Sequence, residues 1–186
     1  MDKIVLIIFF IIFNTVCIKT FAQFTQWESV VVPGQPWMYS IPNGDSADWT
    51  ILNFDNSSWS EGNSGIGYGD DDDQTVISQT IALFMRKAFE IQDVSLISRA
   101  VLDIDYGFVA YINGVEVARD LFSGDYTSYS MSSDGYHEAR LYSGNIPERY
   151  FFDKTILNNG SNVIAIQVHN QALSFSDLSA LPVISF

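Results

Sequence analysis

Apolar and polar positions alternate most clearly between residues 100 and 119. Along Ala100–Tyr106 the residues Ala100, Leu102, Ile104 and Tyr106 share one face and Asp103 and Asp105 share the other, which is the pattern of a strand with one buried and one solvated face. In Phe108–Arg119 two short apolar runs meet at Asn113-Gly114. This dipeptide accommodates positive φ at both centres of a type I′ turn, so the segment predicts a two-residue β-hairpin.

Further short apolar runs, bounded by turn residues, extend the pattern on both sides of the hairpin. They lie at residues 27–32, 37–41, 81–91, 150–156, 163–168 and 181–186. No segment of the sequence keeps a helical period over several turns. Many short strands with turn signals between them predict an all-β fold, specifically an antiparallel β-sandwich of the jelly-roll type. Because no linker or repeat divides these runs, we expect one domain over residues 23–186.

Two long segments between the predicted strands have little periodicity. Residues 44–69 are rich in turn residues, and we expect the aromatic side chains of Trp49, Phe54 and Trp59 to pin this segment to the sandwich. Residues 120–147 contain four tyrosines. A loop of that length is either functional or poorly ordered.

The first residues have the pattern of a secretory signal peptide. Lys3 precedes an apolar run, and small residues stand at the −3 and −1 positions of a cut after Ala22. The alternative is an uncleaved membrane anchor, but the run is short for a span and is broken by Asn14 and Thr15. We therefore expect residues 1–22 to be removed and the protein to be secreted, either outside the cell or into the periplasm, with no membrane attachment afterwards.

Composition narrows the partners of such a protein. The single cysteine, Cys17, leaves with the signal peptide, so the secreted chain has no disulfide. The chain has 22 acidic and 9 basic residues and a net charge of −13. Nucleic acids and anionic membranes demand clusters of Lys and Arg, so this charge disfavours both as partners. It fits a neutral ligand, or divalent cations bound by the surplus carboxylates.

Several segments together carry a family resemblance: Trp49 with Phe54–Trp59, Gly67–Asp70, Arg86–Phe89, Tyr111–Arg119 and Gly160–Asn170. In this order they resemble the galactose-binding-like jelly-roll domain found beside many secreted hydrolases and adhesins. His137–Ala139 and Ser176–Ser179 resemble, more narrowly, the domain near the N-terminus of secreted bacterial proteins that carry a CotH-type (spore-coat) kinase-like domain. The resemblance implies a β-sandwich in a binding or accessory role, because this fold hosts sugar binding, protein binding and structural functions.

The chain departs from the relatives at two places. They often have an acidic pair before the Gly-Phe of the central strand, where this sequence has Asp105-Tyr-Gly-Phe108. A kinase-like domain is not among these residues, so we expect either a free-standing module or the front part of a larger CotH-like or hydrolase protein.

A run of four aspartates, Asp70, Asp71, Asp72 and Asp73, is a candidate metal site. Ca²⁺ takes six to eight oxygen ligands from carboxylates and loop carbonyls, and related jelly rolls often hold a structural Ca²⁺. Four adjacent carboxylates cannot all face one ion, however, and the run has no EF-hand spacing. The sequence therefore leaves two interpretations: a structural calcium site or a solvated acidic turn.

Exposed aromatic rings in loops are the candidate ligand site. The apolar face of a sugar ring stacks on such side chains, while neighbouring polar groups bind its hydroxyls. Because sheet faces are occupied by packing, we expect the site on loops at one end of the sandwich. The candidates are Tyr126, Tyr129, Tyr136 and Tyr142 in the long loop, and Tyr68 in the glycine-rich segment. Each could equally be packed in the core.

The sequence contains no motif that predicts catalysis. It has two histidines, His137 and His169, without the spacing of a zinc site, and neither a nucleophile elbow nor a phosphate-binding loop. We therefore expect a non-catalytic binding module for a carbohydrate or cell-surface glycan. The alternative is a structural domain that packs against a catalytic or kinase-like neighbour and has no small ligand.

Overall fold

The structure, a computed structural model, describes residues 27–69, 71, 73–104, 107–124, 127–135 and 148–186. The predicted signal peptide lies outside this range. Strands account for nearly all of the regular structure in the described part, together with two short 3₁₀ turns, η1 (Val94–Leu96) and η2 (Lys154–Ile156). No helix among the described residues is long and apolar enough to cross a membrane.

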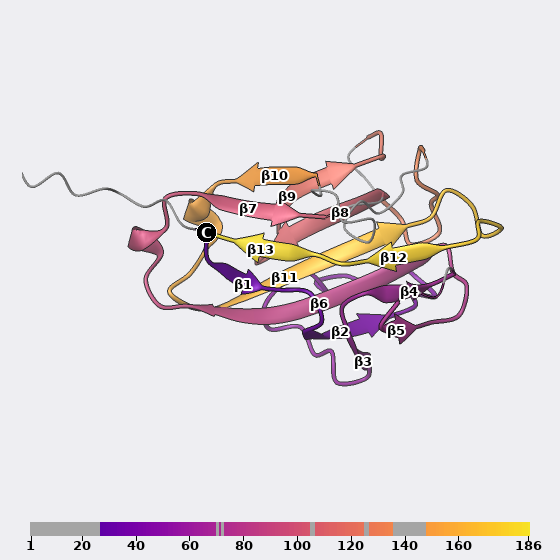
Figure 1. The fold of residues 1–186 in the computed structure, drawn as a ribbon, viewed down its shortest axis with the longest axis horizontal. Coiled ribbons are helices and arrows are strands. Elements are labelled where there is room, and N and C mark those ends of the chain that lie inside the picture. Colours follow the sequence, from indigo (N-terminus) through magenta and orange to yellow (C-terminus); the bar gives the residue numbers. More distant parts are fainter. Residues whose placement is uncertain (1–26, 70, 72, 105–106, 125–126, 136–147) are drawn as a thin grey trace, which may run out of the picture.

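Two sheets lie one over the other and form a sandwich (Figure 1). The larger has the order β3 (Ser60–Asn63), β2 (Pro36–Ser40), β6 (Ala82–Ile91), β11 (Gly160–His169), β8 (Gly107–Ile112) and β9 (Val115–Asp120). The smaller has the order β1 (Ser29–Val31), β13 (Val183–Ser185), β7 (Ala100–Asp103) and β10 (Arg149–Phe152). A three-stranded sheet joins β12 (Leu178–Ala180), β4 (Ile66–Tyr68) and β5 (Thr75–Val76). Every described strand pair except β4–β5 is antiparallel, which confirms the predicted all-β sandwich.

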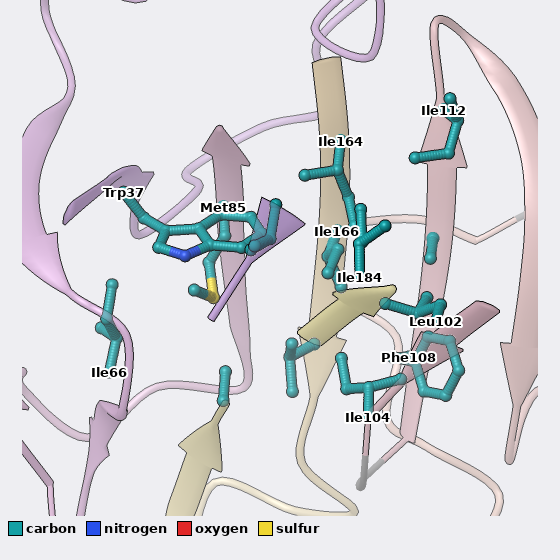
Figure 2. Close-up of a cluster of buried hydrophobic side chains, with 14 of the residues drawn as sticks. Trp37, Ile66, Met85, Leu102, Ile104, Phe108, Ile112, Ile164, Ile166 and Ile184 are labelled. Carbon is teal, nitrogen blue, oxygen red and sulfur yellow. The ribbon is translucent and has the colours of Figure 1, made fainter. Parts of the chain in front are cut away.

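The core fills the space between the sheets (Figure 2). Leu102 and Ile184 enter it from the smaller sheet, and Met85, Ile164 and Phe108 from the larger; all five are fully buried. The buried half of the alternation seen in the sequence is confirmed, because Ala100, Leu102 and Ile104 belong to this core. The expected solvated half is not, since Val101 is 0% exposed and Asp103, which pairs with Arg149, is 6% exposed.

The central hairpin closes at the predicted turn. Asn113 has φ 51° and Gly114 has φ 85°, and β8 pairs with β9 across them. The side chain of Asn113 also reaches beyond the hairpin. Its Nδ2 donates to the carbonyl of Ile156 (2.9 Å) and to Oδ1 of Asn162 (2.8 Å), and its Oδ1 accepts from the backbone N–H of Val163 (3.0 Å). The turn is therefore tied to the start of the central strand β11.

A second aromatic cluster covers the outer face of the six-stranded sheet. Trp49 stacks on Phe84 of β6 with ring centroids 4.4 Å apart, and Phe54, Trp59 and Tyr111 pack beside them. Arg86 of β6 donates to the backbone carbonyls of Trp49 and Ile51, which holds the segment down. The expectation that Trp49, Phe54 and Trp59 pin residues 44–69 to the sandwich is confirmed.

The buried histidine His169 predicts that the fold loses stability in acid. His169, at the end of β11, is 1% exposed, and its Nδ1 lies 2.8 Å from the carbonyl oxygen of Met131. Burial lowers the pKa of His169 to about 4, against an opposing effect of that hydrogen bond. The unfolded chain takes up a proton near the ordinary pKa of 6.5. Stability should therefore fall as pH drops from about 6.5 to about 4, and His169 should contribute up to about 3 kcal/mol of that loss.

Urea denaturation at pH 7 and pH 4.5 tests this prediction. Aspartates and glutamates also titrate in this range, so the matched comparison is His169→Gln, which leaves them unchanged. We expect the parent to lose about 2 kcal/mol more than the variant on acidification. Equal losses in the two proteins would show that His169 has no part in the acid sensitivity.

Candidate functional site

Of the five tyrosines predicted to bind a ligand, the structure describes two, Tyr68 and Tyr129. Tyr68 lies in β4 and is 7% exposed, with its hydroxyl donating to the Thr80 carbonyl and accepting from Nδ2 of Asn170. Burial raises the pKa of its hydroxyl. Its ring packs in the core and offers no open face for stacking on a sugar, in contrast to the expectation from the sequence.

Tyr129 is half-buried against the second aromatic cluster, and its backbone N–H donates to the carboxylate of Asp45 (2.8 Å). The other three tyrosines, Tyr126, Tyr136 and Tyr142, lie outside the described residues. Neither of the two tyrosines that the structure places therefore presents a fully exposed ring.

The acidic run is also only partly described. The side chain of Asp71 is exposed, and its backbone has φ 66°. Asp73 is half-buried and accepts a hydrogen bond from the hydroxyl of Ser179. Asp70 and Asp72 lie outside the described residues. Within the part of the chain that the structure describes, no group of three or more histidine, cysteine, aspartate or glutamate side chains could hold a metal ion.

An exposed aromatic pair lies instead on the outer face of the four-stranded sheet. Phe151 is 58% exposed and Trp27 is 37% exposed, and their ring centroids lie 6.4 Å apart. The alternation of β10 explains the orientation of Phe151, because Tyr150 and Phe152 on either side of it pack against the core. Trp27 is positioned by the residue after it, since the backbone of Glu28 forms two hydrogen bonds with that of Phe186.

An ion pair adjoins the two rings. Arg149, two residues before Phe151 and so on the same face of β10, binds Asp103 of β7 with Nε 2.9 Å and Nη2 3.4 Å from the two carboxylate oxygens. Its guanidinium also lies over the ring of Trp27, 5.6 Å from the centroid. Asp103 is 6% exposed, so this two-point contact fixes Arg149 beside the aromatic pair. We call Trp27, Asp103, Arg149 and Phe151 the aromatic face.

A shallow depression of about 500 Å³ continues from Phe151. It lies between the start of β7 and the turn that follows β10. The residues that line it are Ser98, Arg99, Ala100, Phe151, Phe152, Asp153 and Lys154. Its volume is within the range of small-ligand sites, and its lining combines aromatic rings with charged groups.

The aromatic face has the parts that sugar recognition requires. Two rings offer apolar surface for the face of a sugar ring, and Arg149 offers N–H donors for its hydroxyls. The sequence prediction placed the site on loops and missed this face. The signal was present in Arg149–Phe152, where an aromatic residue stands at an outward-facing strand position, but three adjacent aromatic residues hide the alternation.

No protein-family model matches this chain, and no curated protein sequence matches it. Its fold, however, is similar to solved glycosyl hydrolase structures from Bacteroides. A glycosyl hydrolase family 2 member from Bacteroides cellulosilyticus aligns with a TM-score of 0.50 and 14% identity over 86% of this chain and 20% of that one. A β-glucuronidase from Bacteroides uniformis aligns with a TM-score of 0.51 and 12% identity over 86% and 18%.

A calcium-binding mutant of Bacteroides uniformis β-glucuronidase 2 aligns at a TM-score of 0.50 and 14% identity, over 86% of this chain and 18% of that one. At these identities the similarity shows the fold alone, a β-sandwich also present in these hydrolases. The chain spans about a fifth of the length of the hydrolase chains that it matches.

Proposed function

We propose that this chain is a secreted, non-catalytic module that binds a carbohydrate or cell-surface glycan through the aromatic face. The exposed pair of Trp27 and Phe151 beside the fixed Arg149 is the observation that supports this function. Large apolar side chains that gather on an exposed face mark binding surfaces, because covering them removes apolar area from water. The predicted signal peptide supports secretion, and the similarity to glycosyl hydrolases supports a role beside carbohydrate-active enzymes.

A second candidate function is an accessory domain of a larger hydrolase that packs against a catalytic neighbour. The match to about a fifth of several hydrolase chains favours it. In that case the aromatic face contacts protein instead of sugar. The two functions differ in one respect that can be measured, which is whether the isolated protein retains any glycan.

Truncation of the two rings tests glycan binding. We expect Trp27→Ala and Phe151→Ala each to weaken retention on the bound glycan by about tenfold or more, because aromatic side chains at the centre of an interface carry much of the binding energy. The free energy of unfolding should change by less than about 1 kcal/mol for Phe151→Ala, since that ring is largely exposed. A glycan array identifies the ligand, and affinity electrophoresis with urea denaturation measures the two quantities.

Leu173→Ala is the matched control for this experiment. Leu173 is 57% exposed, close to the 58% of Phe151, but it lies in the segment after β11 and outside the aromatic face. It should leave glycan retention unchanged. Retention that survives loss of both rings would move the site elsewhere, and failure of the parent protein to bind any glycan would favour the accessory function.

Calcium binding by the run Asp70–Asp73 stays a prediction of the sequence. A cation bound only by the folded state stabilises it in proportion to the logarithm of its concentration. Millimolar calcium should therefore raise the melting temperature relative to EDTA, and Asp71→Asn with Asp73→Asn should abolish the difference. Identical melting curves in calcium and EDTA would leave the run as an acidic turn.

A further inference from the structure

Basic side chains lie at the aromatic face and in the depression beside it, although the chain as a whole is acidic. Against 22 acidic residues the sequence has 9 basic ones, and two of those, Lys3 and Lys19, lie in the predicted signal peptide. Arg149 belongs to the aromatic face, and Arg99 and Lys154 line the depression beside Phe151. The net charge of the chain therefore does not describe this surface.

Arg99 is the basic group most open to a ligand. Its side chain is exposed, and among the residues that the structure describes none forms an ion pair or hydrogen bond with its guanidinium. In a chain with so many carboxylates, an arginine at the wall of a depression that has no acidic partner among the described residues is available to an external anion. Its planar group can bind two oxygens of one carboxylate or sulfate together.

Lys154 and Asp153 complete the charges of the lining. The ammonium group of Lys154 donates to the carbonyl of Ile97, which holds it in place and leaves two further N–H donors. The carboxylate of Asp153 accepts from the backbone N–H of Thr155 at 2.9 Å, a bond that lowers its pKa. The lining thus has two cationic side chains and one anionic side chain, and the anionic one already has a donor within the protein.

We propose that the depression binds the carboxylate or sulfate group of an anionic sugar while the sugar ring stacks on Phe151. This inference rests on the proposed function, because it names the class of glycan that the same surface recognises. The acidic remainder of the protein does not prevent it, since charges more than about 8 Å away are largely screened at physiological salt.

The test compares matched polysaccharides that differ in charge. Polygalacturonate and its methyl ester differ in a carboxylate, and κ-carrageenan and its chemically desulfated form differ in a sulfate, so the two pairs distinguish the two anionic groups. We expect the parent protein to retain the anionic member of at least one pair about tenfold more strongly, and this preference to weaken as salt rises. Arg99→Gln should remove the preference, whereas Arg119→Gln on β9, a control of the same charge change, should keep it.

The outcomes separate this inference from the proposed function. If Arg99→Gln binds as the parent does, or if neutral and anionic members bind equally, the anionic preference is wrong. Binding of neutral polysaccharides that is lost in Trp27→Ala and Phe151→Ala would still support the aromatic face as a glycan site. If no polysaccharide binds, both proposals fail. Urea denaturation of Arg99→Gln should match the parent, because the side chain is exposed.

Discussion

Asn162→Ala should lower the free energy of unfolding by about 3 to 4 kcal/mol, because it removes four hydrogen bonds from a buried polar network. Asn162 is fully buried near the start of β11. Its Nδ2 donates to the carbonyls of Asn158 and Gly160, and its Oδ1 accepts from the N–H of Asn158 and from Asn113 Nδ2. Alanine would remove the acceptor of the Asn158 N–H and of one Nδ2 hydrogen of Asn113, whose other hydrogen keeps its bond to the Ile156 carbonyl, and would leave a void at a fully buried position.

The neighbouring Ser161 provides the control for this variant. It is exposed, and its hydroxyl contacts only the carboxylate of Glu90 among the described residues. Ser161→Ala should cost less than about 1 kcal/mol by urea denaturation. If Asn162→Ala lowered the free energy of unfolding by no more than Ser161→Ala does, the network would have no role in joining the central hairpin to β11.

Gly67→Ala should destabilise the fold by about 3 kcal/mol or more, because a methyl group at this position overlaps the backbone of a paired strand. A Cβ atom on Gly67 would lie 1.8 Å from the carbonyl oxygen of Leu178 and 2.5 Å from Oδ1 of Asp73. Gly67 is in β4 and pairs with Ser179 of β12. The two strands would have to separate, and Asp73 would have to move.

Gly44→Ala is the matched control for this substitution. Among the described residues, apart from Gly44 itself and its two chain neighbours, no heavy atom lies within 4 Å of the position that its Cβ would take. Thermal denaturation should therefore show the control melting with the parent and Gly67→Ala melting well below it. Equal melting temperatures for the two variants would show that β4 and β12 do not pack as closely as the structure indicates.

The sequence predicted the central part of the fold from local patterns. Asn113-Gly114 required positive φ at both positions, and the alternation along Ala100–Ile104 required one buried face; the structure has both, but the opposite face of this strand is also buried instead of solvated. It did not predict β3, β4 or β12, because these strands have only three or four residues each and are defined by partners far away in the chain. The sequence left open whether Tyr68 is packed or exposed for the same reason, since the strand that pairs with β4 is β12, far away in the chain.

The candidate site was missed for a different reason. Glycan-binding residues were expected on loops, but the loop that contains Trp49 and Trp59 packs on the outer face of the six-stranded sheet. The outer face of the smaller sheet keeps Trp27 and Phe151 exposed. Tertiary packing decides which sheet of the sandwich a loop covers. The periodicity of the sequence does not predict this choice.

Nuclear magnetic resonance of the indole N–H groups tests the location of the site most directly. The chain has four tryptophans, and they differ sharply in environment: Trp27 lies on the aromatic face, Trp37 in the core, and Trp49 and Trp59 in the second cluster. Titration with the glycan retained on the array should shift the Trp27 signal, assigned by its absence in Trp27→Ala, and leave the other three in place. A shift of the Trp49 or Trp59 signals with an unchanged Trp27 would contradict glycan binding at the aromatic face.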